Sequence, residues 1–375
     1  MKKIIIFYAS YGGGHLSAAK SIKEHLEKNY NDVNVEMIDC MKYISNALEK
    51  ITTGAYKEMA KKLPSLWGHI YMNSQKGPLG HISSRANKIM AIKLKNLILE
   101  KSPDFIISTH PFSSQMVSYL KRKGKINCKL ATILTDFASH EQWLVGHEFT
   151  DLFFVSNDNM EKELMDFGVE KIKIHVTGIP MSERFFEKFD RVEVCNNFNL
   201  NPNKKVILFF GGGEFGLGKD RTTQIFRSLI SNATNYQIVA IAGKNEKMKE
   251  CFEHASSELN APEQIRILGF TNMVPELMSI SDLVITKPGG LTTTESLASH
   301  LPIIIINPIP GQEEQNAEFL EKHGVGIWIK NNDNPDEIFN KLFSSNTKIE
   351  EMRENTEKLA RLYSTRNICK IIMEQ

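Results

Sequence analysis

The chain has 375 residues, a formal net charge of +2 and five cysteines without C-x-x-C spacing. Its length exceeds what one hydrophobic core usually supports, so we expect two domains, while the near-neutral charge argues against a general nucleic-acid binder. The isolated cysteines indicate a reducing compartment and no cysteine-built metal site. The N-terminus shows no signal peptide, and the longest aliphatic run, Ile303–Ile306, is too short to span a bilayer. We therefore expect a cytoplasmic protein with peripheral membrane contact at most.

The first half of the chain alternates short apolar runs with longer amphipathic stretches, a pattern typical of α/β domains. A helix is expected from about His15 to Asn29, and long helical patterns extend to Glu100. The expected strands are Lys3–Tyr8, Val33–Ile38, Phe105–Ser108, Leu130–Leu134, Asp151–Val155 and Ile172–Val176. This half therefore predicts one parallel sheet.

The second half repeats the pattern and predicts a second parallel sheet. Its expected strands are Val206–Phe210, Gln237–Ala242, Ile265–Leu268, Leu283–Ile285 and Pro302–Asn307. A polar segment rich in chain breakers, Ser182–Lys205, suits a linker between the halves. The sequence thus predicts the α/β class, with two Rossmann-like doubly wound domains, residues 1–185 and 186–354, facing a central cleft.

Two glycine-rich turns, Gly12-Gly13-Gly14-His15 and Gly211-Gly212-Gly213-Glu214, each follow an apolar run. In a strand, glycine turn and helix, backbone N–H groups point at an anion bound to the helix N-terminus. Glycine avoids Cβ clashes there and tolerates positive φ, so we expect Gly13 and Gly14 to approach a charged group. The rival is a dinucleotide site with Asp39 on the ribose, but the final glycine of G-x-G-x-x-G is missing. Two turns serving one charged ligand instead indicate a nucleotide-sugar enzyme.

Six segments taken together carry a family resemblance. They are Gly12–His15, Thr135–Phe137, Val176–Pro180, Gly211–Glu214, Thr286–Glu295 and Pro310–Glu313. In this order they resemble the bacterial diacylglycerol glucosyltransferases and plant-type monogalactosyldiacylglycerol synthases, related to the N-acetylglucosaminyltransferase of peptidoglycan lipid intermediates. The resemblance implies a B-fold glycosyltransferase that uses a UDP-sugar, inverts the anomeric centre, and needs no metal or other cofactor. It also implies that a C-terminal helix, residues 355–375, packs on the first domain.

His15 sits where the positive end of a helix dipole lowers the pKa of an imidazole and keeps the ring neutral. A neutral ring can take the proton that a hydroxyl loses as it attacks an anomeric carbon. In the resembled family the histidine of this motif is the favoured base, so we assign that role to His15. Asp136, at a strand end, can orient His15 or act in its place, although a helix cap explains it equally well. His110 and His140 are better explained as structural histidines.

The C-terminal half supplies the expected donor site. The UDP diphosphate would bind the amides of a glycine turn and the dipole of the following helix. The residues of that turn are Gly211, Gly212 and Gly213. A second helix start adds amides and a hydroxyl, from Gly289, Gly290, Leu291 and Thr292. Glu295 fits a capping box with Thr292, but the resemblance puts this glutamate on the ribose hydroxyls, and we favour that role.

Two further groups complete the expected donor site. Phe270 and Thr271 follow a strand at the place where the resembled family packs the uracil ring, although an aromatic residue after a strand is more often part of a core. Gln312, Glu313 and Asn316 follow a long apolar strand, at the edge where open α/β sheets bind ligands. We expect their polar side chains to pair with sugar hydroxyls rather than to cap a surface helix.

The segment Met41–Lys101 has eleven basic residues against three acidic ones, a local net charge of +8. It also carries an apolar stripe at helical spacing: Ile44, Leu48, Ile51, Ala55, Met59 and Leu63. Trp67, Ile70 and Tyr71 follow, with aromatic types that favour the membrane interface. A helix packed on a sheet would show the same stripe, but the charge favours contact with anionic lipids.

We therefore interpret the chain as an inverting hexosyltransferase that moves glucose from UDP-glucose to diacylglycerol at the cytoplasmic membrane face. UDP-galactose is the alternative donor, because Gly211–Glu214 resembles the plant branch whereas Lys287–Thr292 resembles the bacterial one. The expected partners are the UDP-sugar, diacylglycerol and anionic membrane lipids, with no nucleic acid. The rival functions are a soluble UDP-sugar epimerase or hydrolase of the same fold, a nucleotide-dependent sensor, and transfer to a polyprenyl-diphosphate lipid.

Overall fold

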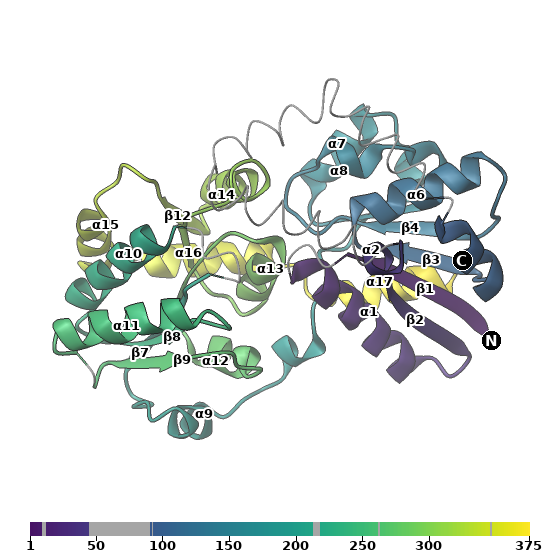
Figure 1. The fold of residues 1–375 in the computed structure, drawn as a ribbon. Helices are drawn as coiled ribbons and strands as arrows, with labels where there is room; N and C mark the ends of the chain where they lie inside the picture. The colour runs from purple at the N-terminus through teal and green to yellow at the C-terminus, as the bar shows by residue number, and fades with distance from the viewer. Residues whose placement is uncertain (10–12, 45–90, 92, 213–217, 262, 346) are drawn as a thin grey trace. The chain divides into compact units, whose positions relative to one another are not determined.

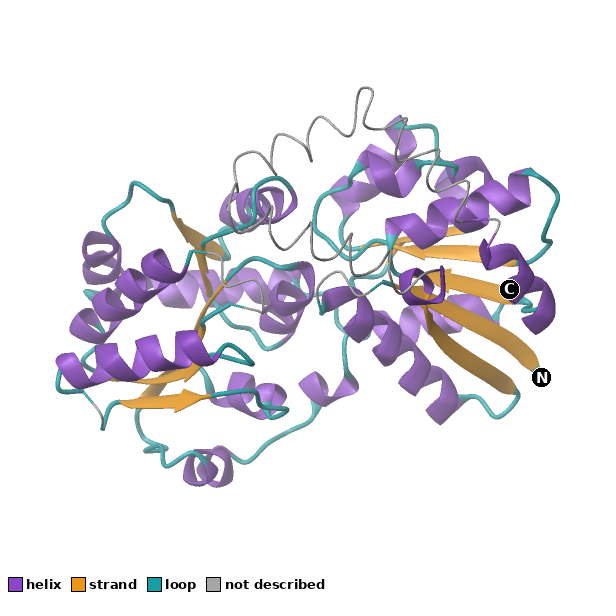
Figure 2. Cartoon of the chain, in the orientation of Figure 1, coloured by secondary structure: helices purple, strands orange, loops and turns teal. Residues whose placement is uncertain are grey.

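The computed structural model describes residues 1–9, 13–44, 91, 93–212, 218–261, 263–345 and 347–375. The chain divides into two compact units. Unit 1 comprises Met1–Glu183, Pro310–Gln315 and Arg361–Gln375, and unit 2 comprises Arg184–Ile309 and Asn316–Ala360. Each unit contains a six-stranded parallel sheet, so the predicted α/β class is confirmed (Figures 1 and 2).

The sheet of unit 1 has the strand order β2-β1-β3-β4-β5-β6. Its strands are β1 (Lys2–Tyr8), β2 (Val33–Asp39), β3 (Phe105–Ser108), β4 (Lys129–Ile133), β5 (Leu152–Val155) and β6 (Ile174–Val176). β1 is apolar along most of its length because helices cover both of its faces. Ile4 and Ile6 pack with α1 (Gly14–Asn29) and α17 (Ser364–Met373). Ile5 and Phe7 pack with α6 (Pro111–Arg122) and the helical residues 93–101.

The other helices among the described residues of unit 1 are short. They are α2 (Cys40–Ile44), α7 (Glu141–Leu144), α8 (Asp158–Asp166) and the 3-10 turns η1 (His147–Phe149) and η2 (Lys171–Lys173). A third 3-10 turn, η3 (Glu183–Phe186), begins at the last residue of the first segment of unit 1.

The sheet of unit 2 has the strand order β12-β11-β10-β7-β8-β9. Its strands are β7 (Lys205–Phe210), β8 (Tyr236–Ile241), β9 (Ile265–Leu268), β10 (Leu283–Thr286), β11 (Ile303–Ile306) and β12 (Gly326–Ile329). Its helices are α9 (Arg191–Asn197), α10 (Lys219–Asn232), α11 (Glu246–Glu258), α12 (Val274–Ile280), α13 (Gly290–Ala298), α15 (Pro335–Phe343) and α16 (Thr347–Leu359), with α14 (Gln312–Lys322) assigned partly to each unit. Phe209, Phe226 and Phe252 form an aromatic cluster with ring centroids 4.4–5.5 Å apart.

Several local expectations were wrong. The edge strand β12 was not predicted, and Ile172, expected in a strand, lies in the turn η2 and is 80% exposed. The expected linker contains a helix, α9, because Asp190 caps it by accepting a hydrogen bond from the N–H of Glu193. The single C-terminal helix is instead two, α16 and α17, because Tyr363 has φ +61° and a left-handed residue interrupts an α-helix.

Most of the predicted basic amphipathic stripe, together with Trp67, Ile70 and Tyr71, lies outside the described residues. Within the part of the chain that the structure describes, no helix combines the length and the apolar character needed to cross a bilayer.

Candidate active site

His15 is the second residue of α1 and is fixed by loops that follow two neighbouring strands. Its Nδ1 atom lies 2.6 Å from the main-chain oxygen of Thr109, directly after β3, and 3.1 Å from the hydroxyl of Thr135, after β4. The hydroxyl of Thr109 donates in turn to the main-chain oxygen of His15, at 3.0 Å. The ring is therefore oriented at the carboxyl edge of the sheet.

These contacts determine which ring nitrogen of His15 carries the hydrogen. A carbonyl oxygen only accepts, so Nδ1 carries the hydrogen and the lone pair of the neutral ring is on Nε2. Burial lowers the pKa of His15 to about 4, although the hydrogen bond to Thr109 acts in the opposite direction. The ring is therefore neutral near pH 7, and Nε2 can accept a proton.

Asp136 lies on the same edge, beyond the end of β4, and is buried. The hydroxyl of Ser156 donates to its main-chain oxygen at 2.7 Å, and Asn157 donates to the main-chain oxygen of Phe137 at 2.9 Å. Asp136 is not the cap of the next helix, since His140 caps α7. Among the described residues, the polar partners that orient the ring of His15 are Thr109 and Thr135, so the orienting role considered for Asp136 is filled by the Thr109 carbonyl.

His110 and His140 have structural partners. The Nδ1 atoms of the two rings accept hydrogen bonds, each 3.2 Å long, from the N–H groups of Phe112 and Gln142 at the starts of α6 and α7. The His110 ring packs edge-on against His15 with centroids 4.6 Å apart. Burial, aided by the charge of a protonated His15, holds the pKa of His110 well below its usual range. Both histidines therefore shape the site through helix caps, and the ring of His110 also packs against that of His15.

The first glycine turn does not have the positive φ angle that was expected to require glycine at position 13. Gly13 has φ −81°, so it does not need the left-handed region, and a Cβ atom added there would meet nothing within 4 Å among the described residues. Gly14 begins α1, which has no side-chain cap and no acidic residue in its first turn. As far as the described residues go, no side chain competes with an anion at this helix start, and Gly13 has an ordinary backbone conformation.

The two described glycines of the second turn are required for different reasons, one for packing and the other for backbone conformation. A Cβ atom on Gly211 would lie 2.7 Å from Phe252 and 2.8 Å from Met248, and the Gly211 N–H already donates to the Ile241 carbonyl. Gly211 is therefore required by the core and its amide is not available to phosphate. Gly212 has φ +91°, which favours glycine, whereas Gly213 lies outside the described residues.

The start of α13 has the properties of an anion site. The N–H groups of Gly290, Leu291 and Thr292 precede the first helical hydrogen bond, from Thr293 to Gly289. No side chain caps this end, and the first turn has no acidic residue. By contrast, α6, α8, α9, α11 and α15 each begin at a residue whose side chain accepts from a first-turn N–H. Orphan amides and a helix dipole favour phosphate at α13.

Glu295 lies in the second turn of α13, not at the third position of a capping box, because the helix begins before Thr292. The capping-box alternative is therefore wrong. Its carboxylate is half-buried and has no hydrogen bond or ion pair among the described residues. Burial raises the pKa of Glu295 to about 8. A half-buried carboxyl group without protein partners is suited to hydroxyl groups of a ligand.

Phe270 is 71% exposed, so the core explanation is wrong for it. The ammonium group of Lys244 lies 5.4 Å from the ring centroid, and both residues follow neighbouring strands, β9 and β8. The hydroxyl of Thr271 accepts from the N–H of Met273 at 3.1 Å and shapes the turn. An exposed ring at this edge can stack on a flat base.

The three residues expected on the sugar have different environments. Asn316 is fully buried and donates to the main-chain oxygen of Pro288 at 3.0 Å, which holds the loop that leads into α13. Gln312 and Glu313 are half-buried in the first turn of α14. Glu314 accepts from the N–H of Gly311 at 2.9 Å and supports the start of that helix. Gln312 and Glu313 are thus better placed than Asn316 to contact a ligand directly.

The sequence reasoning missed Thr109, Thr135 and Lys244 as site residues. A signal existed for all three, since each lies shortly after an expected strand, where parallel sheets place ligand groups.

Comparisons with known proteins agree with this architecture. Residues 15–181 match the family described as monogalactosyldiacylglycerol (MGDG) synthase, and residues 191–362 match glycosyl transferases group 1. MurG of Acinetobacter baumannii shares the fold with a TM-score of 0.67 and 14% identity, over 100% of both chains. A UDP-GlcNAc 2-epimerase of Neisseria meningitidis shares it with a TM-score of 0.64 and 15% identity, also over 100% of both chains.

The fold and the two family matches define a two-domain glycosyltransferase of the B fold. A processive diacylglycerol β-glucosyltransferase of Staphylococcus aureus is 30% identical over 388 residues, covering 100% of this chain and 93% of that protein. The chain belongs to the family of the processive diacylglycerol β-glucosyltransferases.

Proposed function

We propose that this protein transfers glucose from UDP-glucose to the free hydroxyl of diacylglycerol, with inversion at the anomeric carbon. The observation that carries the proposal is the His15 geometry: a neutral imidazole, with Nε2 as the proton acceptor, stands on the half of the chain that matches the MGDG synthase family. Such a base serves attack by an alcohol.

In the proposed reaction the lipid hydroxyl oxygen bonds to the anomeric carbon while Nε2 of His15 takes its proton. The bond between that carbon and the β-phosphate oxygen breaks, and its electron pair leaves with UDP. Negative charge grows on the diphosphate, where the orphan amides of Gly290, Leu291 and Thr292 and the glycine turn at Gly212 stabilise it. We expect these groups to make a metal or other cofactor unnecessary for the leaving group. Asp136 is retained as an alternative proton acceptor.

Other residues of the C-terminal half of the sequence have proposed roles in donor binding. Phe270 and Thr271 would hold the uracil, and Glu295 would accept hydrogen bonds from the ribose diol. Gln312 and Glu313 would contact the sugar, while Asn316 would act through the loop that it holds. Glucose is favoured over galactose because the relative that is 30% identical is named a glucosyltransferase.

The proposed site for the lipid acceptor is argued from the sequence. Diacylglycerol does not leave the bilayer, so the enzyme must meet it at a membrane surface, and the +8 charge of Met41–Lys101 suits an anionic leaflet. We propose peripheral attachment to the cytoplasmic face of the membrane. A second candidate function is that of a soluble UDP-sugar epimerase or hydrolase. Its support is the fold that this chain shares with a UDP-GlcNAc 2-epimerase.

The deciding experiment incubates the protein with radiolabelled UDP-glucose or UDP-galactose and vesicles of diacylglycerol and phosphatidylglycerol. Label extracted with the lipid from UDP-glucose, and little from UDP-galactose, is the expected result. Release of UDP without labelled lipid would indicate a hydrolase, and conversion of the sugar nucleotide without lipid would indicate an epimerase. Either result would overturn the proposal.

A further inference from the structure

Asn307 has an unusual backbone conformation for its place in the fold. Its φ angle is +43°, in the left-handed region that residues other than glycine seldom adopt. Other described residues with positive φ that are not glycine lie shortly after the end of a helix, where a left-handed residue commonly terminates it. They are Ser102, Asn199, Asn260, His300 and Tyr363. Asn307 instead directly follows the strand β11, at the carboxyl edge of the sheet of unit 2.

The left-handed conformation is unfavourable at position 307 for a second reason. Residue 308 is proline, and a proline ring restricts the residue before it largely to extended conformations. Such strain persists only where the surrounding structure enforces it, and it is concentrated at functional sites. The contacts of the Asn307 side chain show what the strained backbone holds in place.

The side chain of Asn307 is bound to the first turn of α10. Its Nδ2 atom donates to the hydroxyl of Thr222 at 2.7 Å and, in a longer contact of 3.4 Å, to the main-chain oxygen of Gly218. Thr222 is 1% exposed, so the shorter bond is largely shielded from water. The same Gly218 oxygen accepts the first hydrogen bond of the helix, from the N–H of Thr222 at 2.8 Å. Asn307 therefore fixes both residues that close the first turn.

Gly218 leaves the room that this contact requires. It is the N-cap residue of α10, has φ +68°, and cannot supply a capping side chain of its own. A Cβ atom added at Gly218 would lie 3.0 Å from both Cγ and Nδ2 of Asn307. A larger residue at 218 would therefore displace the amide of Asn307. The start of α10 is thus held by a side chain from another strand rather than by its own cap.

This contact anchors the exit of the second glycine turn. β7 leads into Gly211 and Gly212, and residues 213–217 connect them to Gly218 in the sequence. Gly211 fixes the entry of the turn, because it packs on the core and its N–H donates to β8. Asn307 fixes the exit from β11, a strand two places from β7 in the sheet. Both ends of the turn are therefore attached to the rigid part of unit 2.

We propose that Asn307 is a positioning residue for the donor. By holding the start of α10, it fixes the exit of the glycine turn that the proposed function places on the UDP diphosphate. Hydrogen-bond donors that are already in place need no reorganisation as charge grows on a leaving group. The strained backbone of Asn307 is maintained because its side chain makes this contact. The inference rests on the proposed donor site and is independent of the acceptor.

The test compares UDP, which carries the diphosphate, with uridine, which does not, in the absence of lipid. Thr222→Val removes the hydroxyl that accepts from Asn307 and keeps the shape of the side chain. It should weaken UDP binding about tenfold in calorimetry, as expected for the loss of one hydrogen bond that places the turn. Uridine binding, measured by NMR titration, should not change. Thr222→Ser keeps a hydroxyl and should retain most of the UDP affinity.

Two variants at position 307 separate the side chain from the backbone. Asn307→Gly adopts the left-handed conformation without strain but has no amide, so it should weaken UDP binding as Thr222→Val does. Asn307→Asp offers the Thr222 hydroxyl an acceptor but places a negative charge at the start of α10. It should weaken UDP binding most at low salt and leave uridine binding unchanged. Wild-type UDP affinity in both variants would overturn the proposal.

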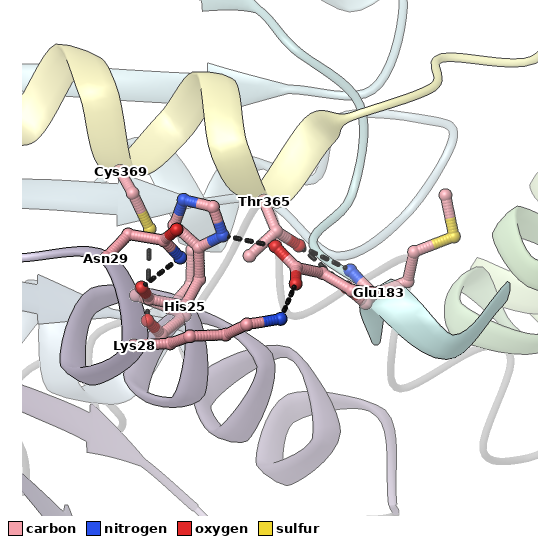
Figure 3. Close-up of polar contacts among 8 residues, drawn as sticks. His25, Lys28, Asn29, Glu183, Thr365 and Cys369 are labelled. Atoms are coloured by element: carbon pink, nitrogen blue, oxygen red, sulfur yellow. Dashed lines mark hydrogen bonds and ion pairs between the residues drawn. The ribbon is translucent and has the colours of Figure 1, made fainter. Parts of the chain in front are cut away.

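The matched controls are asparagines whose Nδ2 atoms also bind the main chain of a helix. Asn232 lies at the opposite end of α10 and donates to the main-chain oxygen of Ser228 at 2.8 Å. Asn29 ends α1 in unit 1 and donates to the main-chain oxygen of His25 at 2.9 Å, beside the polar cluster at Glu183 (Figure 3). Replacement of either asparagine by alanine should leave UDP binding unchanged.

The outcomes distinguish positioning from a general loss of structure. Equal losses of UDP and uridine binding in Thr222→Val, or an equal loss of UDP binding in Asn232→Ala, would overturn the proposal. Unfolding in urea shows whether each variant is folded, and Thr222→Ser and Asn307→Gly keep the comparison open if Thr222→Val is not. Wild-type protein that binds UDP but does not label diacylglycerol would reject the proposed function and leave this comparison intact.

Discussion

The Nδ1 atom of His15 and the main-chain oxygen of Thr109 are 2.6 Å apart. A main-chain oxygen cannot be removed by substitution and cannot donate, so this contact selects one tautomer of the histidine. The fold itself, rather than a carboxylate side chain, prepares Nε2 to accept a proton.

His15→Ala should lower kcat for lipid glycosylation about 10²–10⁴-fold, the usual contribution of a general base. UDP affinity, measured by calorimetry, should not change, because the residues proposed to hold the uracil, the ribose and the departing diphosphate are in unit 2. The control is His254→Ala, a histidine that is 67% exposed at its side chain, on α11. If the His15→Ala variant retained turnover, another group would have to be the base, and Asp136 would be the first candidate.

The pH dependence of kcat/KM follows from the pKa of about 4 for His15. Activity limited by this group should stay level down to about pH 5 and fall as the ring is protonated near pH 4. An unfolded histidine titrates near pH 6.5, so between about pH 6.5 and 4 the unfolded state binds more protons and stability also declines. Circular dichroism at each pH separates the two effects. An inflection near pH 6.5 in fully folded protein would contradict the assignment.

UDP binding should release a proton through Glu295. Its pKa of about 8 keeps the carboxyl group largely protonated at pH 7 without ligand, and acceptance of hydrogen bonds from a ribose diol favours the ionised form. Binding therefore lowers the pKa, and affinity should rise as pH increases toward 8. Calorimetry at pH 7 in buffers of different ionisation enthalpy measures the release. Glu295→Gln should abolish it, unlike Glu246→Gln on α11, and proton uptake would refute the role.

Gly211 and Gly13 should respond differently to alanine. At Gly211 the added Cβ collides with Phe252 and Met248, so the free energy of unfolding in urea should fall by about 1–3 kcal/mol. At Gly13 an added Cβ meets none of the described residues within 4 Å and φ is ordinary, so stability should change by less than about 0.5 kcal/mol while kcat/KM falls. Equal losses of stability would show that both glycines serve packing.

The basic segment can be tested without knowledge of its structure. Replacement of Lys50, Lys57, Lys61 and Lys62 by glutamine should weaken binding to vesicles containing phosphatidylglycerol, measured by flotation. The loss should be largest at low salt, because salt screens charges at a surface. The matched control replaces four exposed lysines of unit 2: Lys247, Lys322, Lys341 and Lys348. Unchanged flotation in the first variant would contradict the membrane assignment.

The sequence predicts the sheets well because strands such as β1 and β11 are buried on both faces and appear as uninterrupted apolar runs. The edge strand β12 was not predicted because it is four residues long, begins with Gly326 and is only partly buried. Ile172 was misassigned since an apolar residue at a strand start can equally lie in an exposed turn. Tertiary packing, which periodicity does not contain, decides both cases.

The site shows the same limit. Glycine turns and helix starts are visible in sequence, so His15 and Gly290 could be found. The Thr109 oxygen could not, because every residue has a carbonyl and only the fold selects one of them. The packing demand on Gly211 was hidden for a similar reason, since Phe252 is distant in sequence.

The packing of α17 against β1 has a consequence for synthesis. Ile368, Cys369 and Ile372 share a core with Ile4 and Ile6, so β1 is buried in part by residues that are translated after unit 2. Unit 2 has all of its segments by Ala360. On a ribosome, unit 1 therefore begins before unit 2 and is completed after it, so the apolar surface that α17 covers stays exposed while unit 2 is synthesised.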